Sequence, residues 1–222
     1  RCITEREDPR DIAVLKEGYA SFMDIRQGGR IGTSSLRRKA QLLHMRPDLE
    51  MADIRGNVQT RLGKLETEGL DAVILAAAGM VRLGFGDQIS EYFDAKTCLP
   101  AIGQGALGLE SRIDDDVTND LIGFFNHPPT AYAVTAERAV LSTLEGGCQV
   151  PIAAYGTVAG DQLELTALVS DVLGKEMIKK TVTCHVDQAV ETGVALAKQL
   201  LEEGAGPILN EVYGCKTFDE KE

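Results

Sequence analysis

The sequence has no apolar run long enough to cross a bilayer, and its first residues do not resemble a secretory signal. Its five cysteines are scattered, and no two of them have the spacing of zinc ligands. We therefore expect neither a membrane span nor a structural metal, and reduced thiols favour a cytoplasmic protein. The three histidines stand apart from one another and are expected to be surface or packing residues.

The glycine-rich signatures of nucleotide-binding loops are also missing. There is no Gly-x-x-x-x-Gly-Lys-Ser/Thr run, and Gly103-Gln104-Gly105 lacks a third glycine at dinucleotide-binding spacing. The net charge of −11 argues against nucleic acid as a general partner. Positive charge is nevertheless concentrated in residues 31–64, which hold seven Lys/Arg against three acidic residues, a local charge of +4. Such a basic island indicates either an anion site or a solvated helix face.

The hydrophobic pattern of the first half predicts alternating strands and helices. We expect strands at 12–15, 30–33, 49–54 and 71–77, and helices at 35–45, 58–67 and 78–83. Ser35 is expected to cap the first of these helices. The alternation predicts an α/β unit with a largely parallel sheet and helices on both faces. In such folds, ligands bind where the strands end and the helices begin.

The second half predicts a unit of another class. Residues 99–110 are a glycine-rich apolar segment that is expected to cross between units and to end in a strand. Helices are expected at 117–125, 130–144 with Thr130 as its cap, 187–203 and a last short one reaching Tyr213, and strands at 152–158, 162–170 and 179–184. This pattern is typical of an α+β domain with a small antiparallel sheet.

Arginines follow three successive strands of the predicted parallel sheet. They are Arg37 and Arg38 after the turn Gly32-Thr33-Ser34-Ser35, Arg55 and Arg61 after the next strand, and Arg82 after the third. The first turn of a helix offers free backbone N–H groups and the positive end of the helix dipole. Since guanidinium groups bind planar anions in a bidentate manner, several separated arginines suit a ligand with many carboxylates better than a single phosphate.

A single cysteine stands out by its loop. Cys148 lies in Glu145-Gly146-Gly147-Cys148-Gln149-Val150-Pro151, where the glycines and the turn allow bulky groups to approach. It follows a predicted helix C-terminus, where the dipole disfavours a thiolate, so a tether formed once suits it better than a turnover nucleophile. The alternatives are a buried apolar cysteine and a Cys-dependent hydrolase, although no histidine lies near it in sequence.

Several motifs together resemble the hydroxymethylbilane synthase family, also called porphobilinogen deaminase. In family order they are Glu5-Arg6-Glu7-Asp8-Pro9-Arg10-Asp11, Gly32-Thr33-Ser34-Ser35-Leu36-Arg37-Arg38, Arg55-Gly56-Asn57-Val58, Leu99-Pro100-Ala101-Ile102-Gly103-Gln104-Gly105-Ala106, Thr135-Ala136-Glu137-Arg138 and the Cys148 loop. The resemblance implies three domains, the first two like type II periplasmic binding proteins. It implies a hinge remnant of domain 1 at 1–10, domain 2 at 11–102, a return segment of domain 1 at 103–123 and an α+β domain 3 at 128–222.

The same resemblance implies the chemistry. The family joins four porphobilinogen units head to tail, with loss of ammonia, into linear 1-hydroxymethylbilane for heme biosynthesis. A dipyrromethane cofactor would be held by a thioether to Cys148. The implied cofactor-binding residues are Thr33, Ser34, Ser35, Arg37, Arg38, Arg55, Gly56 and Gln104, and the implied substrate-binding residues are Arg61 and Arg82. Porphobilinogen and the growing oligopyrrole are the expected partners of a monomeric cytoplasmic enzyme that needs no metal, nucleic acid or membrane.

The sequence departs from the family in one respect. The family's catalytic aspartate lies in a His-Ser-x-Lys-Asp run that does not occur here, and Asp8, Asp11 and Asp53 are not its equivalents. We expect this chain alone to be weakly active or inactive, with the missing segment on a longer polypeptide or on a separate chain. Without it, the return segment would expose a sheet edge and apolar surface. The alternative function is a non-enzymatic polycarboxylate-binding module, which would not need a tethering thiol.

Overall fold

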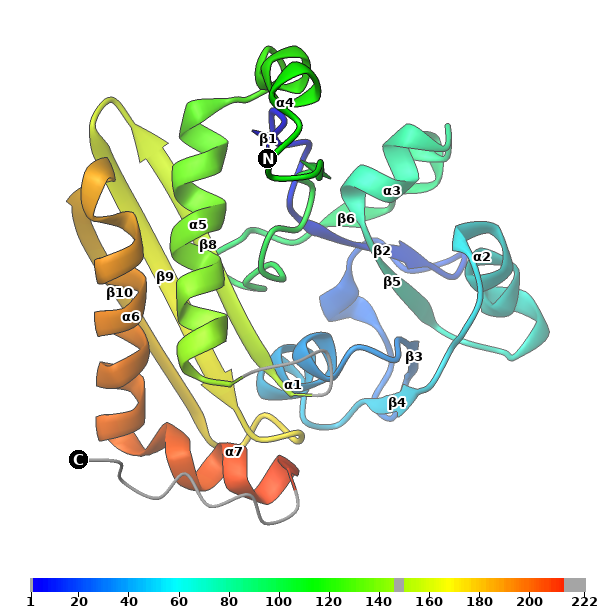
Figure 1. The fold of residues 1–222 in the computed structure, drawn as a ribbon. Coiled ribbons are helices and arrows are strands. Elements are labelled where there is room, and N and C mark those ends of the chain that lie inside the picture. The colour runs from blue at the N-terminus through cyan, green and yellow to red at the C-terminus, as the bar shows by residue number, and fades with distance from the viewer. Residues whose placement is uncertain (1, 146–149, 214–222) are drawn as a thin grey trace.

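The computed structural model describes residues 2–145 and 150–213. These residues form an α/β unit and a C-terminal α+β unit, which are joined by an arm of crossing segments (Figure 1). Among the described residues, no helix combines the length and the apolar character needed to cross a bilayer.

The α/β unit is built on a five-stranded sheet in the order β4-β3-β5-β2-β6. Its strands are β2 (Asp11–Leu15), β3 (Arg30–Gly32), β4 (Glu50–Ala52), β5 (Ala72–Ala76) and β6 (Glu91–Tyr92). The three strands connected by helices, β3, β4 and β5, are parallel as expected, but β2 runs antiparallel to both β5 and β6. The sheet is therefore mixed. Strand–helix–strand alternation dictates parallel pairing only within such units, and no crossover helix joins β2 to β3.

Helices cover both faces of this sheet. They are α1 (Leu36–Met45), α2 (Val58–Thr67) and α3 (Ala77–Arg82), with short 3-10 turns at Phe22–Asp24 and Gly86–Gln88. Alternate residues of β2 enter two different cores: Ala13 packs in the cluster that contains Leu42 of α1, and Ile12 in the cluster with Met80 of α3. All five β2 residues are buried, because the strand has no solvent face. As expected, Ser35 caps α1 by accepting the N–H of Arg38.

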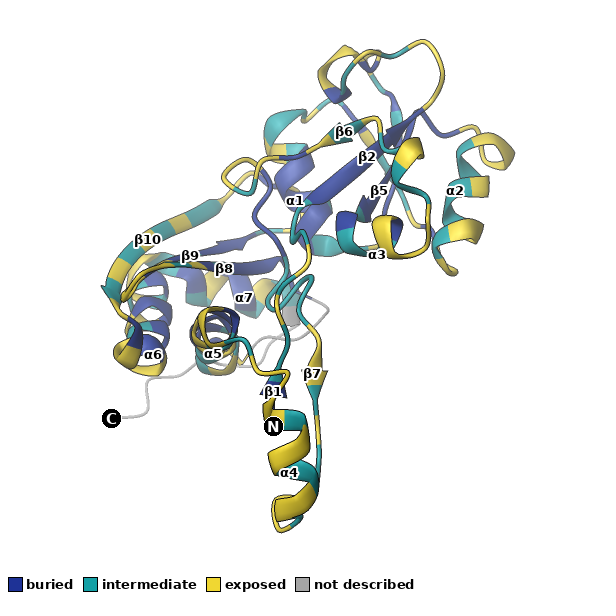
Figure 2. Ribbon diagram, turned by 90° about the horizontal axis from the view of Figure 1, so that it is seen from above, coloured by how far each residue is buried: buried dark blue, intermediate teal, exposed yellow. Residues whose placement is uncertain are grey.

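The arm consists of two chain segments far apart in sequence. Strand β1 (Cys2–Ile3) pairs antiparallel with β7 (Gly108–Leu109), and α4 (Asp116–Gly123) follows with Asp115 as its cap. Figure 2 shows this arm projecting away from both units. It leaves large apolar side chains in solvent, with Ile113 85% and Phe124 87% exposed. This matches the expected exposure of apolar surface.

The C-terminal unit packs three helices on one face of an antiparallel sheet (Figures 1 and 2). The strands β8 (Ile152–Ala159), β9 (Gln162–Ser170) and β10 (Met177–His185) form the sheet; the helices are α5 (Pro128–Thr143), α6 (Ala189–Leu200) and α7 (Gly206–Tyr213), with a 3-10 turn at Val186–Gln188 and a π-helical segment at Leu201–Ala205.

The predicted start of α5 was wrong. The helix begins at Pro128 with His127 as its N-cap residue, because the two prolines occupy the first helical positions, where no N–H is needed. Thr130 lies inside the helix, and its hydroxyl oxygen accepts the backbone N–H of Arg6 from the crossing segment.

Candidate functional site

The carboxyl ends of the parallel strands meet at one edge of the α/β sheet. Gly32 of β3 is in register with Ala52 of β4 and Val73 of β5, so the turns that follow these strands are neighbours. Because β2 runs in the opposite direction, its first residue also lies at this edge, where Asp11 is in register with Ala76. The reversed strand thus brings a carboxylate to the edge at which the sequence predicted only cations.

Asp11 is fully buried and is the centre of a cluster of polar side chains. Arg37 Nη1 donates to Asp11 Oδ2 at 2.6 Å, Arg38 Nε donates to Oδ1 at 2.9 Å, and Gln104 Nε2 donates to the same oxygen at 2.9 Å. Burial alone would raise the pKa of Asp11, but the positive charges of Arg38 and Arg37 outweigh it and hold the pKa well below its ordinary value. Asp11 is therefore negatively charged at neutral pH.

Cys98 lies beside this cluster, with its sulfur 3.6 Å from Asp11 Oδ2. Burial, and then the Asp11 charge, raise the pKa of the Cys98 thiol to about 12. The thiol is therefore neutral and is not a nucleophile.

The predicted site residues Thr33, Ser34 and Ser35 hold the turn between β3 and α1. Thr33 is buried, and its hydroxyl accepts the backbone N–H of Ser35 at 3.3 Å. Ser34 Oγ donates to the carbonyl of Ile54 at 2.6 Å, which ties this turn to the one after β4. The turn is thus fixed by its own hydroxyls, directly before the arginines of α1.

The predicted residues after β4 and β5 lie at the surface. Gly56 has a φ of +120°, and a Cβ there would meet Thr60 at 2.7 Å, so only glycine fits the turn before α2. Arg61 Nε donates to the Gly56 carbonyl at 2.8 Å. Arg55 and Arg82 are exposed, and neither forms an ion pair with any acid in residues 2–145 or 150–213. Arg82 ends α3 and so lies beyond the edge itself.

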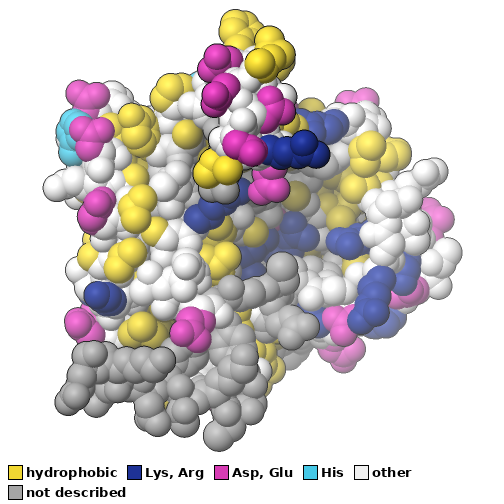
Figure 3. Space-filling model, viewed as in Figure 1, with side chains coloured by type: hydrophobic (Ala, Val, Ile, Leu, Met, Phe, Trp, Pro, Cys, Tyr) yellow, Lys and Arg dark blue, Asp and Glu magenta, His cyan; other side chains and the backbone are white. Residues whose placement is uncertain are grey.

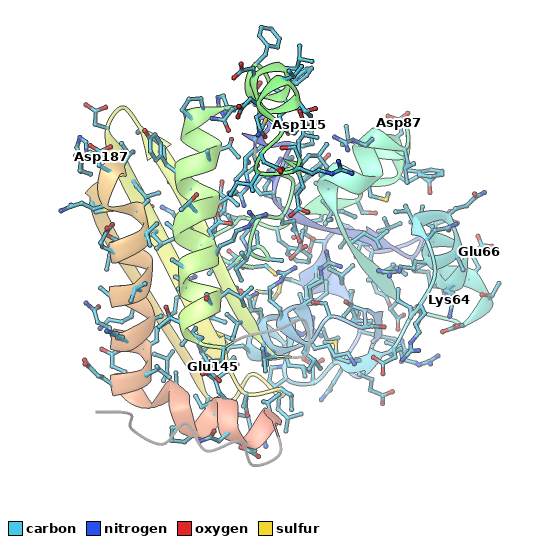
Figure 4. All side chains as sticks on the ribbon, in the orientation of Figure 1. Lys64, Glu66, Asp87, Asp115, Glu145 and Asp187 are labelled. Carbon is cyan, nitrogen blue, oxygen red and sulfur yellow. The ribbon has the colours of Figure 1, made fainter. Side chains whose placement is uncertain are left out.

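Other basic residues of the 31–64 island are neutralised locally. Ion pairs join Lys39 to Asp53, Arg46 to Asp48 and Lys64 to Glu68. Figure 4 shows Lys64 on the outer helix α2, away from the C-terminal unit. Of the two interpretations of the basic island, the solvated helix face therefore applies to these residues. Arg37 and Arg38 are buried instead. Figure 3 shows basic side chains grouped in the recess between the two units.

Cys148 lies outside the described residues. Glu145, the last described residue before it, follows α5 at the end of the C-terminal unit nearest α7, and Asp187 lies at the opposite end (Figure 4). The predicted tether therefore stays a prediction.

A second buried ion pair went unnoticed in the sequence. Arg6 of the crossing segment binds Glu137 of α5 in a bidentate manner, with distances of 2.7 and 2.9 Å. Glu137 is fully buried and also accepts the backbone N–H groups of Gly103 and Gly156. Arg6 Nε donates to the Gln104 carbonyl at 2.9 Å, so this pair connects the C-terminal unit to the residue that contacts Asp11. Glu137 lies on the same face of α5 as the core residues Ala133 and Val140, and this position of a charged residue could have indicated a buried partner.

A cavity of about 770 Å³ lies elsewhere, between the uncovered face of the C-terminal sheet and the segment after β6. Its lining includes Tyr155, Lys179 and Lys96, together with Arg10, whose guanidinium is already paired with Asp8. None of the predicted site residues lines it. The converging donors at the edge of the α/β sheet therefore define the candidate site, and the cavity does not.

Comparison with known proteins matches one family model to the α/β unit and the arm, and a second one to most of the C-terminal unit. Residues 1–120 match the family described as "Porphobilinogen deaminase, dipyromethane cofactor binding domain", and residues 131–202 match "Porphobilinogen deaminase, C-terminal domain". The chain is 59% identical to the porphobilinogen deaminase of Geobacter metallireducens and 60% identical to that of Citrifermentans bemidjiense, in each case over 100% of this chain and 69% of the relative. On these grounds the chain belongs to the porphobilinogen deaminase family.

Proposed function

We propose that the protein is a hydroxymethylbilane synthase, which joins four porphobilinogen units into linear 1-hydroxymethylbilane with release of ammonia in heme biosynthesis. The observation that carries this proposal is the Asp11–Arg37–Arg38 cluster at the start of α1, inside the region that matches the cofactor-binding domain. A substrate and product rich in carboxylates require such clustered guanidinium groups.

The donors at this edge fit a dipyrromethane cofactor, whose acid side chains need several separate cationic partners. Arg38 is buried and contacts Asp11 and the Ile74 carbonyl, whereas Arg55 and Arg82 are exposed and form no ion pair within the described residues. We propose that Thr33, Ser34, Ser35, Arg37, Arg38, Arg55, Gly56 and Gln104 line the cofactor site, and that Arg61 and Arg82 hold the incoming unit. When bound, the cofactor supplies the pyrrole carbon to which the first unit is joined.

The chain's own residues perform binding and positioning in this proposal. The hydroxyl-fixed turn of Thr33 to Ser35 presents the N-terminus of α1, whose dipole favours negative charge. The guanidinium groups hold the carboxylates of the growing chain, and Cys148 forms the thioether. The proton on Cys98 stays in place, because its pKa is about 12, so this thiol does not compete for attachment.

The domain arrangement is also a proposal. We propose that residues 1–10 are a hinge, that 11–102 form domain 2 with a periplasmic-binding-protein-like fold, that 103–123 return to domain 1, and that 128–222 form domain 3. The antiparallel pairing of β1 with β7 supports the adjacency of hinge and return segments. The exposed apolar side chains of the arm support a covering partner. We also propose a monomeric cytoplasmic enzyme; the free thiols of Cys2, Cys98 and Cys184 support the reducing compartment.

Covalent attachment provides the direct test. The purified protein should show the added mass of a dipyrromethane and should colour with Ehrlich's reagent, and both signals should disappear in Cys148→Ala. Cys184→Ala is the matched control, since Cys184 is a free, partly buried thiol of the same unit. Porphobilinogen consumption is measured in parallel. Absence of the adduct would instead favour the non-enzymatic polycarboxylate-binding module, whereas absence of turnover alone would not, because the family's His-Ser-x-Lys-Asp run does not occur in this chain.

A further inference from the structure

We propose that the cavity of about 770 Å³ between the C-terminal sheet and the segment after β6 binds a small zwitterion, with a carboxylate and a primary ammonium at opposite ends of a flat apolar body. Its volume lies in the range of small-molecule sites, about 300–1,000 Å³. This site is independent of the proposed function, because none of the residues proposed to bind cofactor or substrate lines the cavity.

Three cross-strand rows form the floor of the cavity. Lys179 of β10 lies opposite Leu168 of β9 in the first row, and Thr181 lies opposite Thr166 in the second. Glu164 of β9 belongs to the third row. Side chains two residues apart on a strand point to the same face, and four residues span about 13 Å. The floor therefore carries a cation near one end and an anion near the other.

The cationic end has N–H donors to spare. Lys179 Nζ donates to the Lys96 carbonyl at 2.5 Å and keeps two of its three N–H groups. Lys96 forms no ion pair within residues 2–145 and 150–213, and Asp94 offsets one of the two ammonium charges. Arg10 and Asp8 neutralise each other at 2.6 Å. One net positive charge is left, which suits one carboxylate.

A carboxylate at this end would also favour the charged form of Lys179. Desolvation by the surrounding protein lowers the pKa of the Lys179 ammonium. A negative charge beside an ammonium raises its pKa again, so the bound anion and the proton on Lys179 stabilise each other.

The anionic end of the cavity is Glu164. This side chain is exposed and forms no ion pair with any acid-binding group in the described part of the chain. Its neighbours in the third row, Thr157 and Thr183, carry no charge. A primary ammonium has three N–H donors and the opposite charge, so it is the ligand group that suits this carboxylate.

Between the two ends, the cavity offers an aromatic and apolar surface. Tyr155 is in register with Thr166 in the middle row, and its half-buried ring packs against a small apolar cluster that includes Leu99. The hydroxyls of Thr166 and Thr181 bind each other at 2.8 Å, so the middle row needs no polar ligand group. A flat ring beside Tyr155 and Leu99 would bury apolar surface. Because Leu99 belongs to the segment after β6, the ligand would contact both units.

Three probes distinguish this proposal from its alternatives in an NMR titration of the purified protein. They are 4-(aminomethyl)benzoate, which carries both charges on one ring, and its two halves, benzoate and benzylamine. We expect the first to bind about tenfold or more tightly than either half, and to shift the amide signals of Thr166 and Thr181. An anion site would bind benzoate equally well, a cation site would bind benzylamine equally well, and a solvent-filled gap would bind none. Each of these three results would overturn the proposal.

Two substitutions locate the charged groups. Lys179→Met should weaken 4-(aminomethyl)benzoate by about tenfold or more and leave benzylamine unchanged. Glu164→Gln should weaken the same probe to a similar extent and leave benzoate unchanged. Lys180→Met is the matched control, since Lys180 is the next residue of β10 and pairs with Glu203 on the other face of the sheet. Melting curves check that each variant is folded, and the three-probe comparison on the unsubstituted protein stands without them.

Arg55→Lys separates this site from the one in the proposed function. A loss of probe affinity in Arg55→Lys, or signal shifts confined to residues 33–38, would place the probe at the edge of the α/β sheet. That result would overturn the zwitterion site and leave the proposed function intact. Probe binding that depends on Lys179 and Glu164, in a protein without the dipyrromethane adduct, would count against the proposed function alone.

Discussion

His44 Nδ1 donates to the carbonyl of Gly174 at 2.7 Å, and this hydrogen bond joins the two units of the protein. His44 is on α1, which carries Arg37 and Arg38, and Gly174 lies in the turn between β9 and β10. The backbone of this turn packs directly against α1. A Cβ at Gly174 would overlap the carbonyl oxygen of Ala40 and lie 2.7 Å from the backbone nitrogen of His44. The turn between β9 and β10 thus packs against α1, the helix that carries Arg37 and Arg38, at Ala40 and His44.

Gly174→Ala should disrupt the packing of the β9–β10 turn against α1. The substitution places a side chain at a φ of +68° and against backbone atoms, so we expect a loss of about 2–4 kcal/mol in the free energy of unfolding. Gly160→Ala is the matched control: its φ is +61°, but nothing lies within 4 Å of the added Cβ. It should cost only about 1–2 kcal/mol. Urea unfolding of both variants gives the difference, and equal losses would show that the contact is unimportant.

Glu137→Gln should destabilise the protein strongly. The change leaves the Arg6 guanidinium, which is 9% exposed, without its counter-charge, and such a broken buried pair costs about 3–5 kcal/mol. Lys64→Ala, which removes a surface pair with Glu68, should cost less than about 0.5 kcal/mol. Chemical denaturation checks both values. If the two variants lost similar amounts, the Arg6–Glu137 pair would not be a principal connection between the units.

Lowering the pH should reduce the contribution of the Asp11 cluster to the free energy of unfolding. Because the pKa of Asp11 in the folded state lies below the ordinary value of 3.8, the unfolded chain takes up its proton first. The stabilisation is therefore complete above that value and is lost as the pH falls toward the folded-state pKa. The free energy of unfolding, measured from pH 7 down to pH 2, should fall less steeply below about pH 4 in Asp11→Asn than in the unsubstituted protein.

The exposed Asp120→Asn serves as the control for this titration, because its side chain lies on the arm and outside the cluster. Its curve should keep the slope of the unsubstituted protein. Parallel curves for all three proteins would show that Asp11 does not contribute to acid sensitivity.

Arg55→Lys should impair cofactor binding or elongation in the active enzyme. Lysine keeps the charge but loses the planar fork that binds a carboxylate through two bonds. We expect a fall of about tenfold in kcat/KM for porphobilinogen, or in the fraction of protein that carries cofactor. Arg26→Lys, on an exposed arginine that pairs with Asp71, is the comparison. Kinetics that match this comparison would make Arg55 a peripheral residue.

Local signals in the sequence determined much of this structure. The helix predicted at 58–67 matches α2 at Val58–Thr67, and the strands predicted at 152–158 and 162–170 are present as the antiparallel pair β8 and β9, because periodicity and turn residues act over short distances. Ser35 was predicted as a cap for the same reason. The direction of β2 was not predictable in this way, since it depends on which strand lies beside it.

The site shows the same limit. Arg37 and Arg38 were found from their place after a strand, but their partner Asp11 is 26 and 27 residues away and joins them only through the reversed strand. Glu137 lies 131 residues from Arg6. Pairings at such separations follow from the packing of the whole chain, and a single sequence does not contain a local pattern for them.

The reversal of β2 has a mechanical consequence. Asp11, the first residue of β2 after the chain enters the α/β unit from the arm, pairs with Arg37 and Arg38. Gln104 of the returning segment donates to both the Pro9 carbonyl and Asp11 Oδ1. Any change in the position of the returning segment would therefore act directly on the carboxylate that pairs with Arg37 and Arg38.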